Sequence, residues 1–174
     1  MITPDYVRLM AAYTDWQNRS IYAAAETLTD AERRSDRGAF FKSIHETLNH
    51  VLWGDQLWMH RLAGTPAPAS PDIPGSVRQY DGWTELAGAR RALDTAILDW
   101  SRRVRSDDLR GTFSWYSGAI QAEVRRPRWT LVVQLFNHGT HHRGQVHALL
   151  TAAGARPEDT DVPFMSSVEY PWPG

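Results

Sequence analysis

The chain has 174 residues, of which 42% are hydrophobic and 22% charged, and its formal net charge at pH 7 is −1. This length and apolar content suit one compact domain over residues 1–174 and exclude general disorder. The near-zero net charge gives no electrostatic basis for binding nucleic acid, and no apolar run approaches the roughly 18 residues of a membrane span. We therefore expect neither nucleic acid nor a membrane among the partners.

The absence of cysteine narrows the chemistry further. Because the chain has no thiol, disulfides, iron–sulfur clusters, thiolate zinc sites and cysteine nucleophiles are excluded. A bound metal must therefore be held by imidazole, carboxylate or water. The first ten residues show no basic segment followed by an apolar one, so the sequence predicts no signal peptide and a cytoplasmic protein.

The first half of the chain predicts two long amphipathic helices. One begins at Thr3-Pro4-Asp5, a capping residue followed by a proline at the first helical position, and continues to about Leu28. Residues 29–38 are polar and are expected to form a connection. The second helix runs from about Phe41 to Leu62, with apolar residues three or four positions apart. Four prolines between residues 66 and 74 then predict a surface loop.

The second half predicts two more helices and a segment of different character. A third helix is expected over about residues 81–104, and a fourth from about Arg128 to Ala153. Residues 112–126 alternate in part and are broken at Gly118, which predicts a hairpin-like excursion. The tail, residues 157–174, is expected to be an extended arm. The predicted fold is all-α: a four-helix bundle with a short hairpin-like excursion before the last helix.

Histidines are concentrated on the second and fourth helices. The seven are His45, His50, His60, His138, His141, His142 and His147. At about 100° per residue, His142 lies about 40° from His138 beside the apolar stripe, whereas His141 and His147 point elsewhere. Two imidazoles four residues apart can bind one metal ion. The spacing alone supports a metal pair and hydrogen-bonded core-edge histidines equally.

A third metal ligand would have to come from another helix. On the second helix, His45 lies about 140° from His50, so the two cannot face one site. His50 is the better candidate. Taken alone, however, it is better explained as a structural histidine.

Four segments resemble the DinB/YfiT-like metalloenzyme family. They are Tyr13–Arg19 (YTDWQNR), Thr47–Trp58 (TLNHVLWGDQLW), Phe136–Gln145 (FNHGTHHRGQ) and Asp161–Met165 (DVPFM), and they extend over nearly the whole chain. The resemblance implies an up-down-down-up four-helix bundle, a homodimer, and a metal held by His50, His138 and His142. The adjacent His141 leaves a one-residue ambiguity, which the helical angles resolve in favour of His142.

Other polar residues near these motifs have simpler interpretations. Asp55 is expected to be a cap, an ion pair or a support for neighbouring side chains rather than a catalytic base. Arg143 is expected to be structural rather than to bind an anionic substrate. Gln134 and Gln145 border the histidine pair and are candidates for contacts to the metal ligands. The aromatic residues of the first helix are expected to form core or dimer surface.

Three histidines would leave at least one coordination position of the metal open, which is typical of chemistry or exchangeable ligand binding. Zinc and nickel both accept imidazole ligands. The resemblance implies a metal-dependent transferase that uses a low-molecular-weight thiol. Two alternatives stay open: a metal-dependent hydrolase in which Asp55 helps to move protons, and a non-enzymatic dimeric metal- or ligand-binding stress-response module. The sequence assigns no catalytic residue.

Overall fold

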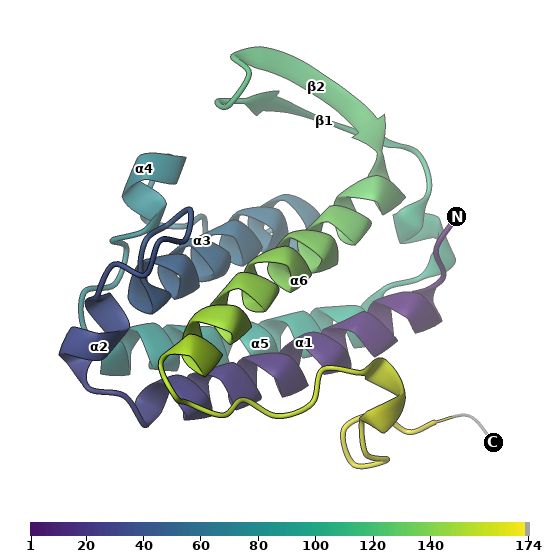
Figure 1. Ribbon diagram of the computed structural model, residues 1–174. Coiled ribbons are helices and arrows are strands. Elements are labelled where there is room, and N and C mark those ends of the chain that lie inside the picture. Colours follow the sequence, from purple (N-terminus) through teal and green to yellow (C-terminus); the bar gives the residue numbers. More distant parts are fainter. Residues whose placement is uncertain (173–174) are drawn as a thin grey trace.

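The computed structural model describes residues 1–172, and this part of the chain is mostly helical (Figure 1). Its regular elements are α1 (Pro4–Glu26), α2 (Asp30–Arg34), α3 (Ile44–Ala63), α4 (Ile73–Ser76), α5 (Trp83–Arg103), η1 (Ser106–Leu109), β1 (Thr112–Ser117), β2 (Ala122–Pro127), α6 (Arg128–Ala152) and η2 (Val162–Phe164). The predicted helical fold is therefore confirmed for most of the chain. The excursion before the last helix is a true two-stranded antiparallel sheet, so the fold is not purely α.

Capping residues mark the ends of the long helices: side chains accept hydrogen bonds from free backbone amides at the starts of α1 and α3, and a glycine ends α3. The Thr3 hydroxyl accepts a hydrogen bond from the Tyr6 amide at the start of α1. The Ser43 hydroxyl accepts one from the Glu46 amide, so α3 begins three residues after the predicted position. Gly64 ends α3 in the left-handed conformation (φ +69°), which glycine adopts without steric cost.

Two short helices were not predicted: α2 lies within the connection expected at residues 29–38, and α4 begins in the loop expected at residues 66–74 and ends two residues beyond it. In α2, Thr29 and Glu32 form a reciprocal capping box. In α4, the Asp72 side chain accepts a hydrogen bond from the Gly75 amide, and Pro74 occupies the first turn, where its missing N–H is not needed. The sequence analysis missed these helices because helices of four or five residues show no hydrophobic period.

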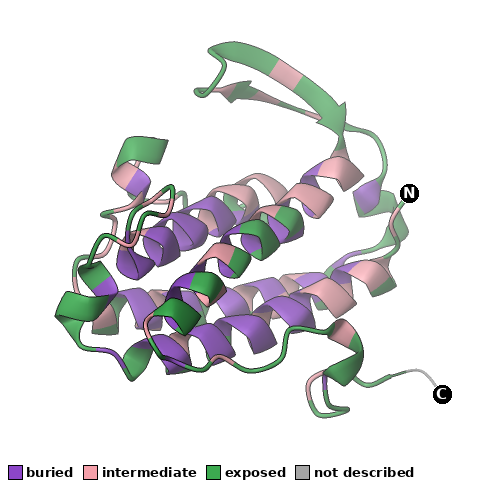
Figure 2. Cartoon of the chain, viewed as in Figure 1, coloured by how far each residue is buried: buried purple, intermediate pink, exposed green. Residues whose placement is uncertain are grey.

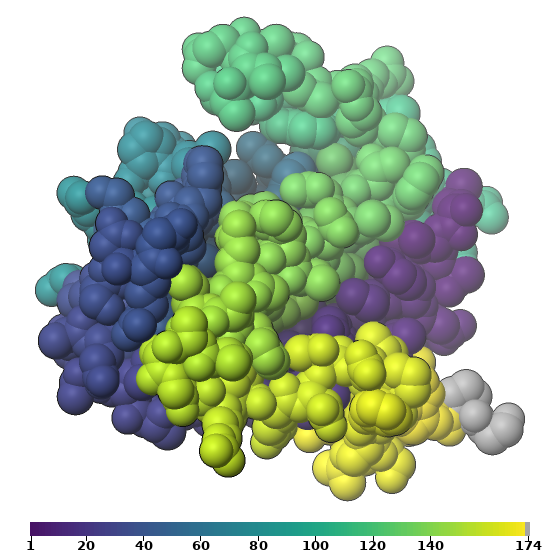
Figure 3. Space-filling model, viewed as in Figure 1, coloured from purple at the N-terminus to yellow at the C-terminus, as the bar shows by residue number. Residues whose placement is uncertain are grey.

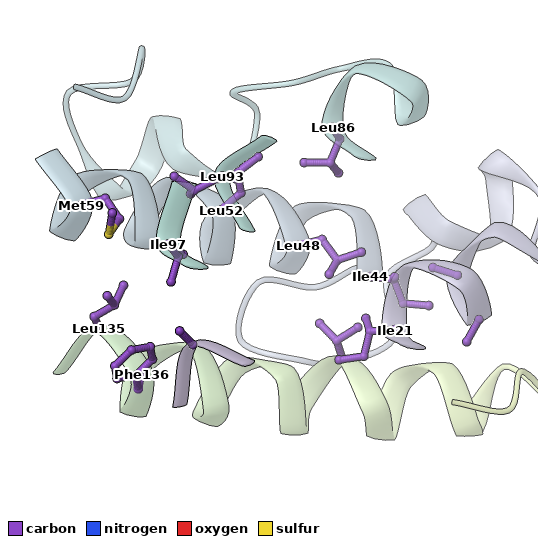
Figure 4. Packing of buried hydrophobic residues seen from close by; sticks show 14 of the residues in the cluster. Ile21, Ile44, Leu48, Leu52, Met59, Leu86, Leu93, Ile97, Leu135 and Phe136 are labelled. Carbon is purple, nitrogen blue, oxygen red and sulfur yellow. The ribbon is translucent and has the colours of Figure 1, made fainter. Parts of the chain in front are cut away.

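The four long helices enclose one apolar core. Helix α1 packs against α5 and α6, and α3 packs against α5 and α6. Their buried faces point inward in Figure 2, and Figure 4 shows the side chains that meet between them. The largest fully buried apolar side chains are Phe136, Ile21, Ile44, Leu48, Leu52, Met59, Leu86, Ile97, Leu109, Leu135 and Leu150. No helix among residues 1–172 is both long and apolar enough to cross a membrane.

The hairpin projects from one end of the helices. Strand β1 pairs with β2 from Thr112↔Pro127 to Ser117↔Ala122. Most of the hairpin is exposed (Figure 2). Two of its side chains contact the helices: the Trp115 ring meets the ring of Trp58 edge-on at 5.9 Å between centroids, and the Arg128 guanidinium lies 5.7 Å from the centre of the Phe113 ring.

The tail lies along α1, as the predicted arm would. The Tyr13 hydroxyl donates to the Thr160 carbonyl at 2.8 Å, and the Gln17 amide donates to the Asp159 carbonyl at 2.8 Å. Met165 is buried against Tyr13 and Trp16. These contacts show that part of the aromatic face of α1 is covered by the tail. Residues 173–174 of the predicted arm lie outside the described residues.

Candidate metal centre

Helices α3 and α6 bring three of the seven histidines together. His50 lies on α3, and His138 and His142 lie one turn apart on α6. One ring nitrogen from each lies within 4.8 Å of the other two, and no further His, Asp or Glu of residues 1–172 joins this group. The ring centroids are 5.2 Å apart for His50 and His138, 4.8 Å for His50 and His142, and 4.5 Å for His138 and His142.

These separations are close to what a metal requires. With metal–nitrogen bonds of about 2.0 Å, the nitrogens of a tetrahedral site lie about 3.3 Å apart. Since the separations are at most 4.8 Å, each ring nitrogen needs to move toward the centre of the group by about 1 Å or less. His50 and His142 are buried and His138 is half-buried. In Figure 3 the surface is hollowed between the hairpin and the α4 region, and α3 and α6 border this hollow.

Hydrogen bonds fix the orientation of two of the imidazoles. His50 Nδ1 lies 2.7 Å from Ser76 Oγ, and Ser76 donates its own hydroxyl proton to the Ile73 carbonyl at 2.6 Å. Ser76 therefore accepts from the N–H of His50, which places the proton on Nδ1. Similarly, His142 Nδ1 donates to Gln145 Oε1 at 2.8 Å. In both residues Nε2 is left with a lone pair available for a metal.

The position of the His138 ring on α6 depends on Gly54 of α3, which leaves room for it. A Cβ at Gly54 would lie 2.5 Å from Cε1 of His138 and 2.9 Å from its Nδ1. Any larger residue at position 54 would displace the ring. Nδ1 of His138 is buried and has no hydrogen-bond partner.

Burial keeps the three imidazoles neutral. It lowers the pKa of His50 to about 3, with a further contribution from the two neighbouring histidines, and it lowers the pKa of His138 to about 4. Burial also lowers the pKa of His142. Neutral imidazole is the form that binds a metal. The two fixed tautomers, the unpartnered ring nitrogen of His138 and the neutral state of the imidazoles therefore fit a divalent transition metal, with Nε2 of His50 and His142 available as ligand atoms.

Helices α3 and α5 also carry a group of buried ion pairs. Arg90 on α5 forms ion pairs with Asp55 on α3 at 2.7 Å and with Asp94 on α5 at 2.8 Å. Asn18 of α1 donates to Asp94 at 2.8 Å. Asp55 is therefore an ion-pair residue, as its preferred interpretation predicted.

Arg143 is also buried, and it has no ion pair within 4.0 Å among residues 1–172. Its Nη2 donates to Thr140 Oγ1 at 3.1 Å, and its guanidinium carbon lies 5.8 Å from the centre of the Tyr13 ring. Burial lowers the pKa of the guanidinium, and Asp55 opposes this effect. These contacts agree with the structural role predicted for Arg143.

The other histidines lie outside the group. His45 Nε2 contacts the Tyr80 carbonyl at 3.1 Å, and His60 Nδ1 contacts the Thr65 carbonyl at 2.6 Å. His141 and His60 are exposed, and His147 is half-exposed. The His141 ring lies 4.9 Å from that of His142, but His141 is exposed and does not belong to the group of three.

Two residues near the group were not predicted from the sequence. The Phe41 ring lies 4.0 Å from that of His50 and 5.5 Å from that of His142. Ser76 contacts His50 from α4. The one local signal for Ser76 was Asp72 before Pro74, which is typical of a helix start.

Two comparisons with known proteins found matches. The sequence profile of the DinB family matches residues 1–172. The protein DinB of Bacillus subtilis (strain 168) is 22% identical over 161 residues, which cover 90% of this chain and 91% of that protein. No solved structure gives a significant match. Because the family profile extends over nearly the whole length, the chain belongs to the DinB family.

Proposed function

We propose that His50, His138 and His142 bind one divalent transition metal, zinc or nickel, through Nε2 of His50 and His142 and one ring nitrogen of His138. The proposal is supported by the convergence of the three imidazoles within 4.8 Å and by the hydrogen bonds that occupy Nδ1 of His50 and His142. Imidazole ligands suit both metals, so the ligand type does not favour one over the other.

We further propose that the protein is a metal-dependent transferase that acts with a low-molecular-weight thiol. The observation that carries this proposal is that the group within residues 1–172 offers three candidate ligands, since structural zinc sites are usually closed by four. A metal bound there would favour the thiolate form of a thiol in the open position. The chain has no cysteine, so the sulfur has to come from a separate molecule. Phe41 and Trp53, whose rings lie 4.0 Å and 5.7 Å from that of His50, would limit the access of water.

Metal content tests the site itself. We expect purified wild-type protein to bind about one zinc or nickel ion per chain by elemental analysis. His142→Ala should lose this metal, because only two ligands remain. His141→Ala is the matched control, since His141 is adjacent in sequence but exposed, and it should bind metal like the wild type. Retention in His142→Ala together with loss in His141→Ala would contradict the proposed ligand set.

Activity assays distinguish the possible reactions. The metal-loaded protein should conjugate electrophiles only when a low-molecular-weight thiol is added. Turnover of ester or amide substrates without thiol would indicate the hydrolase instead. If neither assay gives turnover and chelation mainly destabilises the protein, the non-enzymatic dimeric module is the better description.

We also propose that the long helices form an up-down-down-up four-helix bundle and that the protein is a homodimer. The packing of α1 and α3 against both α5 and α6 supports the first proposal. The second rests on the family resemblance. Light scattering coupled to gel filtration tests it, with twice the chain mass of 19.8 kDa as the expected result. The cytoplasmic location stays a prediction.

A further inference from the structure

A cavity of about 330 Å³ lies between α1, α6 and the tail. It is on the side of α6 that faces away from the three histidines. At about 100° per residue, Thr140 and His147 of its wall lie about 160° and 140° from His142 around the helix. None of the residues that line it belongs to the histidine group. The cavity is therefore a site of its own, and its ligand does not depend on the proposed metal.

A buried arginine is part of the cavity wall. Arg143 is 4% exposed, and its guanidinium has no ion pair within 4.0 Å in the part of the chain that the structure describes. Its Nη2 donates to Thr140 Oγ1, whereas Nε and Nη1 are buried and have no hydrogen-bond partner. The structural contacts of Arg143 thus occupy one of its three nitrogens. Because unpaired charged donors are costly in a protein interior, such a group is typical of a site that receives an acceptor from a ligand.

The surroundings of Arg143 do not neutralise its charge directly. Among the described residues, none that lines the cavity is Asp or Glu, and His147 is the other basic side chain. Asp55 raises the pKa of Arg143, but it does so from beyond 4.0 Å and is already held in its ion pair with α5. Asp161 in the tail is exposed to water, which screens its charge. The cavity therefore offers a positive wall to an anion.

The remaining wall indicates a small ligand with an apolar body. Tyr13 and Ile21 are buried, while Gly144 and Ala148 are exposed, so the cavity opens to the surface along α6 and closes toward α1. These four residues present an aromatic ring and aliphatic groups. A planar guanidinium matches a planar carboxylate, which can accept two N–H bonds. One arginine among apolar groups suits a singly charged carboxylate better than a phosphate, whose oxygens need more donors.

We propose that this cavity binds a small carboxylic acid with an apolar body, such as an aromatic monocarboxylate, in its anionic form. The carboxylate accepts hydrogen bonds from the unpaired N–H groups of Arg143, which reach it when the guanidinium turns toward the cavity. The body of the ligand packs against Tyr13 and Ile21. Binding pairs the buried donors and places a negative charge beside the buried cation.

A titration with benzoate tests the ligand class. Benzamide is its uncharged counterpart of the same shape, and inorganic phosphate is an anion without an apolar body. The Nε–H signal of Arg143 in proton–nitrogen NMR, identified by its loss in Arg143→Gln, reports the contact. At constant ionic strength we expect benzoate to shift this signal saturably and benzamide to leave it unchanged. No response to benzoate, an equal response to benzamide, or saturation by phosphate in place of benzoate would each overturn the proposal.

Variants of α6 test the position of the ligand, with benzoate affinity measured by calorimetric titration. An added Cβ at Gly144 meets no atom within 4 Å, so Gly144→Leu should fold and place its side chain at the mouth of the cavity. We expect at least tenfold weaker binding in Gly144→Leu and in Arg143→Gln.

Ala152→Leu is the matched control, because Ala152 is exposed on α6 and does not line the cavity. It should bind benzoate like the wild type. Unchanged affinity in Gly144→Leu, or an equal loss in Ala152→Leu, would overturn the proposal. Both of these variants retain Arg143, so they decide the matter even if Arg143→Gln does not fold.

Discussion

At the scale of single residues, Gly54 has the most direct consequence for the site. A Cβ there would lie 2.5 Å from Cε1 of His138, so Gly54→Ala must displace the imidazole. Alanine is a better helix former than glycine by about 1 kcal/mol, so α3 itself should remain intact. We expect at least a tenfold loss of zinc affinity in a competition titration, with the helical circular dichroism unchanged.

The control for this variant is Gly144→Ala. It makes the same substitution on α6, close to His142 in sequence, at a position where an added Cβ meets no atom within 4 Å. It should bind zinc like the wild type. If both variants bind zinc equally well, the close approach of Gly54 and His138 does not position the ligand.

The sequence predicts part of the candidate site for a clear physical reason. His138 and His142 lie on one helix, so their relative direction follows from helical geometry, and the structure places them together and His141 outside. His50 is on another helix, and its position relative to the pair depends on how α3 packs against α6. Only the family resemblance identified it. Ser76 could not be predicted as its partner, because that contact joins residues 26 positions apart.

At the scale of elements, the hairpin is held to the helices by few side chains. Trp115 meets Trp58 edge-on at 5.9 Å, and the Arg61 guanidinium lies 5.6 Å from the Trp115 ring. Such aromatic contacts contribute about 0.5–1.5 kcal/mol beyond their buried area. We therefore expect Trp115→Ala to speed amide hydrogen exchange over residues 112–127 severalfold and to leave exchange in α3 and α6 unchanged.

Tyr116→Ala is the matched control for the hairpin, because Tyr116 is the next residue of β1 and is 55% exposed. Its removal should change exchange in the hairpin much less. Equal effects of the two variants would show that the contact between Trp115 and Trp58 does not hold the hairpin in place.

Long helices could be predicted from the sequence, whereas helices of four or five residues could not. Helices of 20 residues or more repeat their apolar pattern over several turns, and α1, α3, α5 and α6 were expected within three residues of their observed starts. The hairpin was recognisable because its residues alternate and break at Gly118. Helices α2 and α4 have five and four residues. Their only signals were the caps at Thr29 and Asp72, which also occur in turns.

At the scale of the whole molecule, the buried ion pairs of α3 and α5 make stability depend on pH. Burial raises the pKa of Asp94 from 3.8 to about 6, despite the attraction of Arg90. The folded protein therefore binds this proton more tightly than the unfolded chain does. The resulting stabilisation is present below pH 3.8 and is lost as the pH rises through about 6.

Comparison with Asp94→Asn isolates this effect from that of the buried histidines. The asparagine can still accept the hydrogen bond from Asn18, which Asp94 accepts at 2.8 Å. We expect the free energy of unfolding of the wild type, minus that of the variant, to decrease between pH 4 and pH 6 in urea titrations. If this difference instead grows with pH, the attraction of Arg90 outweighs the burial of Asp94.

A metal at the candidate site should stabilise the whole fold, because its ligands come from two helices that are far apart in the sequence. His50 lies on α3 and the other two ligands on α6, so the unfolded chain does not present the three together. Zinc at 100 times its dissociation constant would then add about 2.7 kcal/mol to the free energy of unfolding. For a chain of this length that raises the melting temperature by about 5–10 °C. Calorimetry should show this rise for the wild type, its reversal by a chelator, and no rise for His142→Ala. An equal rise in the variant would place the bound zinc elsewhere on the protein.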